Sequence, residues 1–341
     1  MAESNKKRKM ATLADDVAAI DKVYFDGYLD HTVHKKMLGD ATRMNAYRAA
    51  VEANVHLFKD KVVLDIGAGT GILSLLSAKA GAKRVFAVEA SAMASDCRKT
   101  VEENGFGEVI TVVNSKVEDI GDKLPGDVTK VDVIISEWMG LLLVQESVLD
   151  SVLWARDHFL AEDGVLFPSH ARIYFCPASL SKELAVWDDV LGFKFEALKR
   201  RAKEQLLLTS PLRRTLSGDD LMATKPMLFK YFNLKTMQVS SVRSMRSTLP
   251  FTLKGPFDAI AVWFDVRFAY GTNSEDSGSG KDVIVLSTSP TEPFTHWEQA
   301  VVVLPQTVPT PEGAVVKIGC VMSQSEENFR HYEIGFEIPR F

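Results

Sequence analysis

The chain has 341 residues, of which 46% are hydrophobic and 25% are charged. This length allows about two domains, and the composition is typical of soluble globular proteins. The cysteines, Cys97, Cys176 and Cys320, have neither the spacing of zinc ligands nor that of a disulfide framework, so we expect a reducing compartment and no metal site. No apolar stretch is as long as a membrane span and no secretory apolar core is present, so no membrane segment is predicted.

The formal net charge is −5, from 40 basic and 45 acidic residues. Four of the basic residues form the run Lys6-Lys7-Arg8-Lys9, and residues 1–14 are predicted to be a disordered basic tail. Such a run can also be a nuclear address, so we expect a cytoplasmic protein, with nuclear entry as a further option. Without the run, 36 basic residues stand against 45 acidic ones, a net charge of −9. An acidic folded part favours a cationic partner over nucleic acid.

Two helices are predicted before the first strand. The first, over 15–28, carries three aromatic residues within one turn: Tyr24, Phe25 and Tyr28. An aromatic stripe of this kind is usually core, although it can also cover a flat ligand. The second helix runs from Asp40, a plausible N-cap, to about Phe58. Arg43 lies one turn into this helix, outside its apolar pattern, where helix statistics favour a solvated charge.

The strongest local signal is the segment 62–71, an apolar strand that enters a glycine-rich turn and is followed by a helix. Gly67 and Gly69 permit a tight turn and a close approach of the backbone to a ligand. Ile72 occupies the third glycine position of the dinucleotide fingerprint, which disfavours a pyrophosphate-binding site. The next strand ends at Glu89, an acid that can accept hydrogen bonds from both hydroxyls of a ribose, so we predict a nucleoside site.

Strands and helices continue to alternate, which predicts a doubly wound parallel sheet with a Rossmann-like fold over 15–168. The further predicted elements are a helix over 92–104, a strand over 109–113, a strand over 131–135, a helix over about 147–159 and a strand near 165–167. The loop after the third strand contains Lys116-Val117-Glu118-Asp119, where an acidic group could meet the amino edge of an adenine.

The chemistry is predicted in the stretch 136–147, which directly follows an apolar strand and should therefore lie at the carboxyl edge of the sheet, where open α/β folds bind ligands. It contains two acids, Glu137 and Glu146, and Gly140 between them permits a sharp turn. Both acids could face one pocket, where a planar guanidinium between them would relieve their repulsion. The loop alone equally allows one glutamate to cap the following helix while the other is solvated.

The composition changes after Pro168, where short β-rich runs separated by turns predict an antiparallel sandwich or β-barrel over 169–341. The predicted strands are 171–176, 228–232, 259–268, 283–287, 300–303, 315–322 and 332–337. A helical, charged insertion at about 184–216 suggests a docking arm, with an exposed flap as the alternative. The segment Gly271–Lys281, rich in Ser and Gly, predicts a flexible loop.

Several motifs occur together in one order: Tyr24-Phe25-Asp26-Gly27-Tyr28, His34, Met37, the segment 63–71, Glu89, Val117-Glu118, Ser136-Glu137-Trp138-Met139-Gly140 with Glu146, and Thr295-His296-Trp297. With these motifs the chain resembles the protein arginine N-methyltransferases, specifically the type I class that makes asymmetric dimethylarginine. The resemblance begins at about Val23, is close up to Ser169, is weaker through the barrel and is weakest in the arm. It implies a Rossmann-like methyltransferase domain followed by a β-barrel domain with a helical dimerisation arm.

The resemblance also implies S-adenosylmethionine as the cofactor, with S-adenosylhomocysteine as its product. The residues it implies for cofactor binding are Tyr24, Phe25, His34, Met37, Arg43, Asp65, Gly67, Gly69, Glu89, Val117 and Glu118. Arg43 would pair with the methionyl carboxylate, and Asp40 would face His296. The implied catalytic residues are Glu137 and Glu146, a clamp on the substrate arginine, with His296. The residues implied for substrate binding are Tyr28, Met139 and Trp297.

The implied reaction is methyl transfer to the guanidinium nitrogens of arginine in proteins, giving mono- and asymmetric dimethylarginine, with basic histone or Arg/Gly-rich proteins as substrates. A protonated, delocalised guanidinium is a poor nucleophile, so positioning and charge stabilisation should dominate catalysis. Val148 stands where many relatives have methionine, which leaves the product type less well defined than methyl transfer. The family also implies a homodimer through the arm, without a metal, a membrane or direct binding of nucleic acid.

Three alternatives remain. A small-molecule methyltransferase would need neither the double-glutamate loop nor the β-rich second half. A catalytically weak scaffold or regulatory partner of another methyltransferase, derived from the family, would tend to lose cofactor or clamp residues, yet this chain retains Asp65, Glu89, Glu137, Glu146 and His296. An NAD-linked enzyme is disfavoured because the third glycine of the dinucleotide fingerprint is missing.

Overall fold

The computed structural model describes residues 16–270 and 283–339. The chain divides into two compact units. The first unit extends up to Trp138 and also contains residues 147–167 and 326–330; the second contains residues 139–146, 168–325 and those after Arg330. The predicted basic tail 1–14 and the predicted flexible loop Gly271–Lys281 lie outside the described residues.

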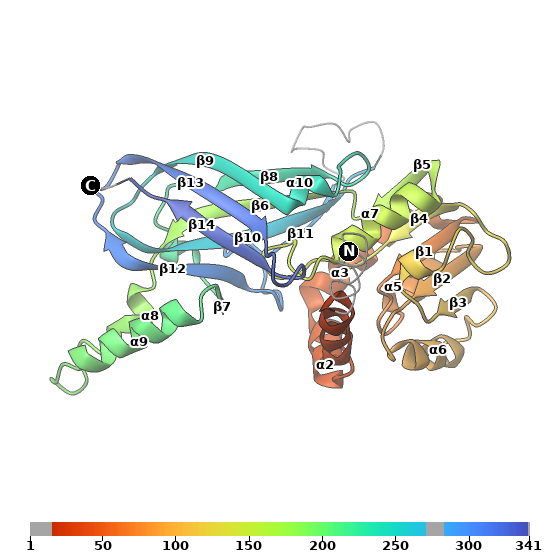
Figure 1. Ribbon diagram of the computed structural model, residues 1–341, viewed down its shortest axis with the longest axis horizontal. Coiled ribbons are helices and arrows are strands. Elements are labelled where there is room, and N and C mark those ends of the chain that lie inside the picture. The colour runs from red at the N-terminus through yellow and green to blue at the C-terminus, as the bar shows by residue number, and fades with distance from the viewer. Residues whose placement is uncertain (1–15, 271–282, 340–341) are drawn as a thin grey trace, which may run out of the picture. The chain divides into compact units, whose positions relative to one another are not determined.

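The first unit is built on a five-stranded sheet with the order β3-β2-β1-β4-β5, in which every pair is parallel (Figure 1). Its strands are β1 Val62–Ile66, β2 Arg84–Val88, β3 Ile110–Val113, β4 Val131–Ile135 and β5 Leu160–Phe167, and its helices include α5 Ile72–Lys79, α6 Ala94–Glu103 and α7 Val148–Phe159. Because β1 lies between β2 and β4, the order reverses at the ends of β1 and β4, where open α/β sheets bind ligands. The predicted doubly wound fold is confirmed.

Helical residues 16–27, α2 His31–Gly39, α3 Ala41–Ala53 and α4 Val55–Phe58 precede this sheet. The Asp40 side chain accepts a hydrogen bond from the Arg43 N–H at 3.0 Å, so the predicted N-cap is confirmed. The single helix predicted from Asp40 to Phe58 is instead divided at Asn54, whose side chain donates to the Ala50 carbonyl and whose backbone leaves helical geometry.

The second unit consists of antiparallel sheets, one of six strands that contains the order β7-β12-β10-β6-β8 with β11 beside β10, and one of three strands with the order β14-β13-β9. The strands are β6 His170–Ala178, β7 Leu212–Arg214, β8 Met227–Asn233, β9 Ser244–Thr252, β10 Phe257–Phe268, β11 Ile284–Ser287, β12 Gln299–Val308, β13 Val315–Gln324 and β14 Tyr332–Glu337. Phe175 of β6 stacks on Phe229 at 4.5 Å and meets Phe336 of β14 edge-on at 5.7 Å, so aromatic side chains join the two sheets.

The predicted insertion at 184–216 differs in extent from the observed helices. Helix α8 spans Ser181–Ala185 and α9 spans Glu196–Leu208, and both extend away from the sheets of the second unit (Figure 1). Residues 212–214 are strand β7, which pairs with β12, so the helical arm ends earlier than predicted.

Strand β9 was not predicted because its polar residues alternate with few apolar ones and it contains Pro250. It forms one edge of its sheet, where a proline is tolerated. Two short helices, α10 Ser240–Arg243 and the 3₁₀ turn η2 Gly218–Asp220, complete the connections of this unit.

Candidate active site

The glycine-rich turn after β1 has the geometry that its sequence demands. Gly67, Gly69 and Gly71 have φ values of 69°, 53° and 85°, in the left-handed region that other residues rarely adopt. Gly71 also lacks space, because a Cβ atom there would lie 2.9 Å from the Sγ of Cys97. The backbone of the turn therefore stays bare at the carboxyl edge of the sheet, where a ligand can approach it closely.

Glu89 is fixed against this turn. Its carboxylate accepts one hydrogen bond from the Gly69 N–H and another from the Ser91 N–H, both at 2.8 Å. The Asn114 side chain donates to the Glu89 carbonyl at 2.9 Å and so fixes the backbone as well. Each carboxylate oxygen has a second lone pair, so an oriented Glu89 can still accept hydrogen bonds from the hydroxyls of a ribose.

Asp65, at the end of β1, is a fully buried acid with one unsatisfied oxygen. Its Oδ2 accepts a hydrogen bond from the Ser74 hydroxyl at 2.7 Å, whereas Oδ1 has no hydrogen-bond partner among the described residues. Burial raises the pKa of Asp65 to about 7. A buried acceptor without a donor is unfavourable, and the ammonium group of a ligand would supply the missing donor.

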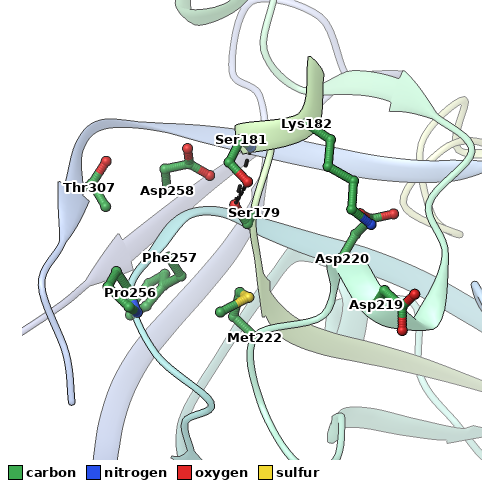
Figure 2. Close-up of a pocket in the computed structure, with 10 residues that line it drawn as sticks. All are labelled: Ser179, Ser181, Lys182, Asp219, Asp220, Met222, Pro256, Phe257, Asp258 and Thr307. Carbon is green, nitrogen blue, oxygen red and sulfur yellow. Dashed lines mark hydrogen bonds and ion pairs between the residues drawn. The ribbon is translucent and has the colours of Figure 1, made fainter. Parts of the chain in front are cut away.

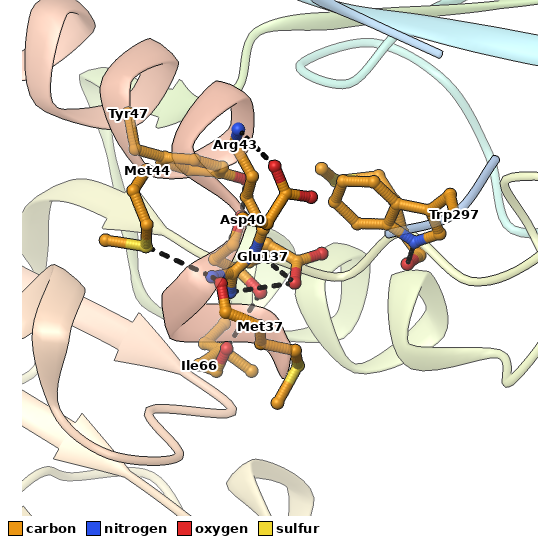
Figure 3. Close-up of polar contacts among 10 residues, drawn as sticks. Met37, Asp40, Arg43, Met44, Tyr47, Ile66, Glu137 and Trp297 are labelled. Carbon is orange, nitrogen blue, oxygen red and sulfur yellow. Dashed lines mark hydrogen bonds and ion pairs between the residues drawn. The ribbon is translucent and has the colours of Figure 1, made fainter. Parts of the chain in front are cut away.

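Arg43 and Glu137 form an ion pair that is almost completely buried (Figure 3). Nε and Nη2 of Arg43 lie 3.0 and 2.9 Å from Oε2 of Glu137, and the two side chains are 8% and 9% exposed. Nη1 of Arg43 donates to the Met37 carbonyl at 3.2 Å and contacts the sulfur of Met44 at 3.2 Å. The interpretation of Arg43 as a solvated charge is therefore wrong.

The physical reason is the orientation of α3. Its buried face contains Arg43, Tyr47, Ala50 and Val51, which follow helical spacing. Tyr47 donates to the Ser136 carbonyl at 2.9 Å, and the Ser136 hydroxyl donates to the Ile66 carbonyl at 2.8 Å. These bonds hold α3 over the ends of β1 and β4, so the first turn of the helix brings its arginine to Glu137.

The loop between the two glutamates is a tight turn. Gly140 and Leu143 exchange two backbone hydrogen bonds of 3.0 Å. The sharp turn is predicted at Gly140. The residues with left-handed backbone are instead Leu142, Leu143 and Glu146, with φ values of 59°, 69° and 78°, followed by Ser147 at 56°. Gly140 is required for space instead, because a Cβ atom there would lie 2.2 Å from the Gln145 carbonyl oxygen. Glu137 belongs to the first unit and Glu146 to the second, so a shared pocket stays a prediction.

The aromatic residues of the N-terminal helix form one cluster. The ring of Tyr24 lies 5.3 Å from that of Phe25 and 5.1 Å from that of Tyr28. His34 is buried, and its Nε2 forms a hydrogen bond of 2.7 Å with the Tyr28 carbonyl. A Cβ atom on Gly69 would lie 3.9 Å from the His34 ring, which places this histidine beside the glycine turn.

Val117 and Glu118 begin the 3₁₀ turn η1, Val117–Asp119. Val117 is buried, and Oε1 of Glu118 accepts a hydrogen bond of 2.5 Å from the Ser151 hydroxyl of α7.

In the second unit, Nε1 of Trp297 donates to the Met139 carbonyl at 2.8 Å, and the His296 ring lies 4.0 Å from the Trp297 ring. The predicted contact between Asp40 and His296 would join the two units and stays a prediction.

The sequence does not single out the polar residues that hold these acids: the Ser74 and Ser151 hydroxyls, the Asn114 side chain and the Ser91 N–H. Small polar residues at the starts of helices and in loops are too common for their positions to signal such a role. Two further missed residues, Asp21 and Arg330, form an ion pair in the first unit with Arg330 Nε and Nη2 at 3.1 and 2.5 Å from Oδ1 of Asp21.

The second unit also contains a pocket of about 340 Å³ (Figure 2). Its lining includes the ion pair of Lys182 with Asp220, at 2.7 Å, and the Asp258 carboxylate, which accepts a hydrogen bond of 2.8 Å from the Leu180 N–H. None of the predicted site residues lines it. Within residues 16–270 and 283–339, no group of His, Cys, Asp and Glu side chains could hold a metal ion, and no helix is long and apolar enough to cross a membrane.

Comparison with known proteins gives two family matches. Residues 169–338 match the arginine methyltransferase oligomerization subdomain, and residues 48–147 match the ribosomal protein L11 methyltransferase (PrmA) family. The chain is 38% identical to probable protein arginine N-methyltransferase 1.2 of Arabidopsis thaliana, over 95% of this chain and 84% of that protein. It is 36% identical to protein arginine N-methyltransferase 1 of Saccharomyces cerevisiae, over 95% and 90%.

Solved structures agree with the sequence matches. The structure of Arabidopsis thaliana protein arginine methyltransferase 10, described as uniquely open, has a TM-score of 0.78 and 34% identity, and the match covers 92% of this chain and 94% of that one. The Trypanosoma brucei PRMT1 enzyme–prozyme heterotetrameric complex with AdoHcy has a TM-score of 0.77 and 33% identity, with 92% and 95% covered. The PRMT6–SAH structure has a TM-score of 0.77 and 31% identity, with 91% and 100% covered.

Replacing Gly140 with alanine should disrupt the loop, because the new Cβ would overlap the Gln145 carbonyl and force the backbone to move. We expect Gly140→Ala to lower the free energy of unfolding by about 1–3 kcal/mol, measured by urea denaturation. Gly335→Ala is the matched control in the same unit, since its Cβ would meet nothing within 4 Å. Equal stability of the two variants would contradict the tight-turn geometry.

The raised pKa of Asp65 predicts a specific dependence of stability on pH. Between pH 4 and 7 the unfolded chain loses this proton while the folded chain keeps it, so the contribution of Asp65 to the free energy of unfolding falls as pH rises. The pKa of about 7 corresponds to a total change of about 4 kcal/mol. Asp65→Asn should remove this dependence in urea titrations at pH 5 and pH 8, whereas the exposed Asp163→Asn should retain it. Parallel pH profiles for wild type and Asp65→Asn would refute the assignment.

Proposed function

The chain belongs to the protein arginine N-methyltransferases, and from this membership we propose the residue roles, products, substrates and assembly that follow. It transfers methyl groups from S-adenosylmethionine to the guanidinium nitrogens of arginine in proteins and releases S-adenosylhomocysteine. The observation that carries the proposed site is the buried Glu137 carboxylate at the end of β4, which already binds a planar guanidinium.

The proposed cofactor site is formed by the glycine turn and the acids around it. The unsatisfied Oδ1 of Asp65 suits the cofactor ammonium, and Glu89 suits the ribose hydroxyls. Arg43 would meet the methionyl carboxylate, replacing its weak contact with the sulfur of Met44. The remaining proposed cofactor contacts are made by Tyr24, Phe25, His34, Met37, Gly67, Gly69, Val117 and Glu118.

When bound, the cofactor supplies an electrophilic methyl group on a sulfonium. The work of the protein is then to orient the substrate guanidinium, whose charge is delocalised and whose nitrogens are weak nucleophiles. Glu137 and Glu146 would hold two of its nitrogens and draw positive charge toward them, so that the third is free to react. Alignment of this kind can contribute about 7–11 kcal/mol to lowering a barrier. The proton would leave late, toward Glu146 or His296.

We assign mono- and asymmetric dimethylarginine as products, and the assignment rests on Met37 and on Thr295-His296-Trp297. Tyr28, Met139 and Trp297 would line the arginine channel. Basic histone or Arg/Gly-rich proteins are the proposed substrates, because the chain without its basic run has a net charge of −9. A cytoplasmic location, with nuclear entry through the basic run, is proposed as well. The catalytically weak scaffold is not favoured.

We propose that the chain forms a homodimer through its helical arm. Residues of the arm expose large apolar side chains: Val186 59%, Leu191 93%, Phe193 69% and Leu208 86%. Large apolar side chains exposed to this extent are typical of surfaces that contact another protein. The match of residues 169–338 to an oligomerization subdomain supports the proposal.

The function is tested by mass spectrometry of an Arg/Gly-rich peptide after incubation with the protein and S-adenosylmethionine. We expect asymmetric dimethylarginine, and Glu137→Gln should lower turnover by at least about 100-fold, since it removes the charge that holds the guanidinium. The exposed Glu108→Gln is the matched control and should keep full activity. Symmetric product would overturn the product class, and normal turnover by Glu137→Gln would overturn the clamp. If wild type gives no product and binds no cofactor, the scaffold alternative gains support.

The assembly is tested with Leu191→Asp and Phe193→Asp in the arm. Each should weaken the dimer by at least about tenfold, because a charge would be desolvated at an apolar contact. Sedimentation velocity across a concentration series measures the change. Val315→Asp, at a 67% exposed position of β13, is the control and should leave assembly unchanged. A dimer of undiminished strength in both arm variants would rule out the arm as the interface.

A further inference from the structure

Asp21, in the helical residues 16–27, lies between two cations from distant parts of the chain. The residue is only 6% exposed. Its Oδ1 accepts from Nε and Nη2 of Arg330 at 3.1 and 2.5 Å, and its Oδ2 pairs with Nζ of Lys116. Burial acts to raise the pKa of Asp21, but the hydrogen bonds from Lys116 and Arg330 lower it below its ordinary value, so the carboxylate stays ionised.

The same arginine covers the aromatic residues of that helix. Cζ of Arg330 lies 3.9 Å from the centroid of the Tyr24 ring and 5.4 Å from that of Phe25. The Arg330 side chain is 12% exposed, so both the ion pair and the cation–π contact are largely removed from water. One guanidinium therefore binds an acid and an aromatic ring that lie one helical turn apart.

Arg330 comes from the hairpin turn between β13 and β14, yet residues 326–330 are part of the first unit. Two hydrogen bonds fix the backbone of this turn. The Asn328 side chain accepts a hydrogen bond of 3.0 Å from the Arg330 N–H, and the Phe329 carbonyl accepts one of 2.6 Å from the Ser147 hydroxyl. Ser147 directly follows Glu146 and precedes α7.

Lys116 connects the same carboxylate to the proposed adenine loop, because it directly precedes Val117 and Glu118. Asp21 thus joins three segments: the N-terminal helix, the residue before the adenine loop, and the hairpin turn of residues 326–330. We call Asp21, Tyr24, Lys116 and Arg330 the Asp21 cluster. None of these four residues lies in a strand of the first unit's sheet.

We propose that Arg330 is a positioning residue. It holds the N-terminal helix so that Tyr24 and Phe25 stay at the cofactor site. This inference rests on the proposed function, since it takes these two residues as cofactor contacts. It predicts that the Asp21 cluster sets how long the helix stays in place, and hence how tightly S-adenosylhomocysteine binds. Methyl transfer from cofactor that is already bound depends on it less.

The test compares wild type with Arg330→Ala, Arg330→Lys, Asp21→Asn and the double variant Asp21→Asn/Arg330→Ala. Calorimetric titration with S-adenosylhomocysteine should give a Kd about tenfold higher for Arg330→Ala, and hydrogen exchange should be faster in residues 16–27. Arg330→Lys should be intermediate, because lysine keeps the charge but not the planar stacking or the paired donors. The Kd of the double variant for S-adenosylhomocysteine should be no higher than that of the weaker-binding single variant, since Asp21 and Arg330 act through the same ion pair.

Two further measurements distinguish a positioning role of Arg330 from a general effect on stability. KM for S-adenosylmethionine should rise more than kcat falls, and Tm should stay within a few degrees of wild type. Arg246→Ala, which removes an exposed arginine of β9, is the matched control and should change none of these quantities.

Exchange measured without cofactor tests the hold on the helix directly. Equal exchange of residues 16–27 in wild type, Arg330→Ala and Asp21→Asn would overturn the proposal, even if the wild type methylates arginine normally. The opposite result is also informative. If the wild type methylates no arginine but exchange of residues 16–27 is faster in the variants, Arg330 holds the helix and only the proposed function fails. If Arg330→Ala does not fold, Arg330→Lys and Asp21→Asn supply the same comparison.

Discussion

The buried ion pair between Arg43 and Glu137 is the interaction on which the arrangement of the site depends. A carboxylate at the end of a central strand cannot be buried alone without a large desolvation penalty, so a cation must be brought to it. Helix α3 supplies that cation from its first turn, and the hydrogen bond from Tyr47 to the Ser136 carbonyl fixes its position one turn later. Charge pairing, in addition to apolar contact, therefore sets where the helix lies on the sheet.

The sheet and the glycine turn could be predicted because each depends on local sequence. Apolar runs define the central strands, and left-handed backbone at Gly67 and Gly69 follows from residue type. The burial of Arg43 could not be predicted in this way, because its partner is 94 residues away and helix periodicity alone places it outside the apolar pattern. Strand β9 was missed for a related reason: its pairing with β13, rather than its own composition, makes it a strand.

Backbone strain is concentrated in the loop after Met139, where Leu142, Leu143 and Glu146 all have positive φ. The two leucines are 3% and 0% exposed, so burial of their side chains offsets the unfavourable backbone. Burial of both leucine side chains restricts the loop, and a restricted backbone favours accurate placement of a carboxylate. The sequence predicts a sharp turn at Gly140, since glycine permits one and leucine rarely adopts a left-handed conformation.

Residues 326–330 complete a unit whose sheet ends at Phe167, and this has a consequence for biosynthesis. Ribosomes synthesise chains at roughly 5–20 residues per second, and domains can fold as they emerge. The last segment of the first unit therefore emerges roughly 10–30 s after its last strand. During that interval Asp21 can pair with Lys116 but not yet with Arg330, and the Ser147 hydroxyl lacks the Phe329 carbonyl. The nascent chain thus passes through a stage in which its sheet is formed but its N-terminal helix is not yet secured, and a message truncated within the second unit would leave the protein in that state.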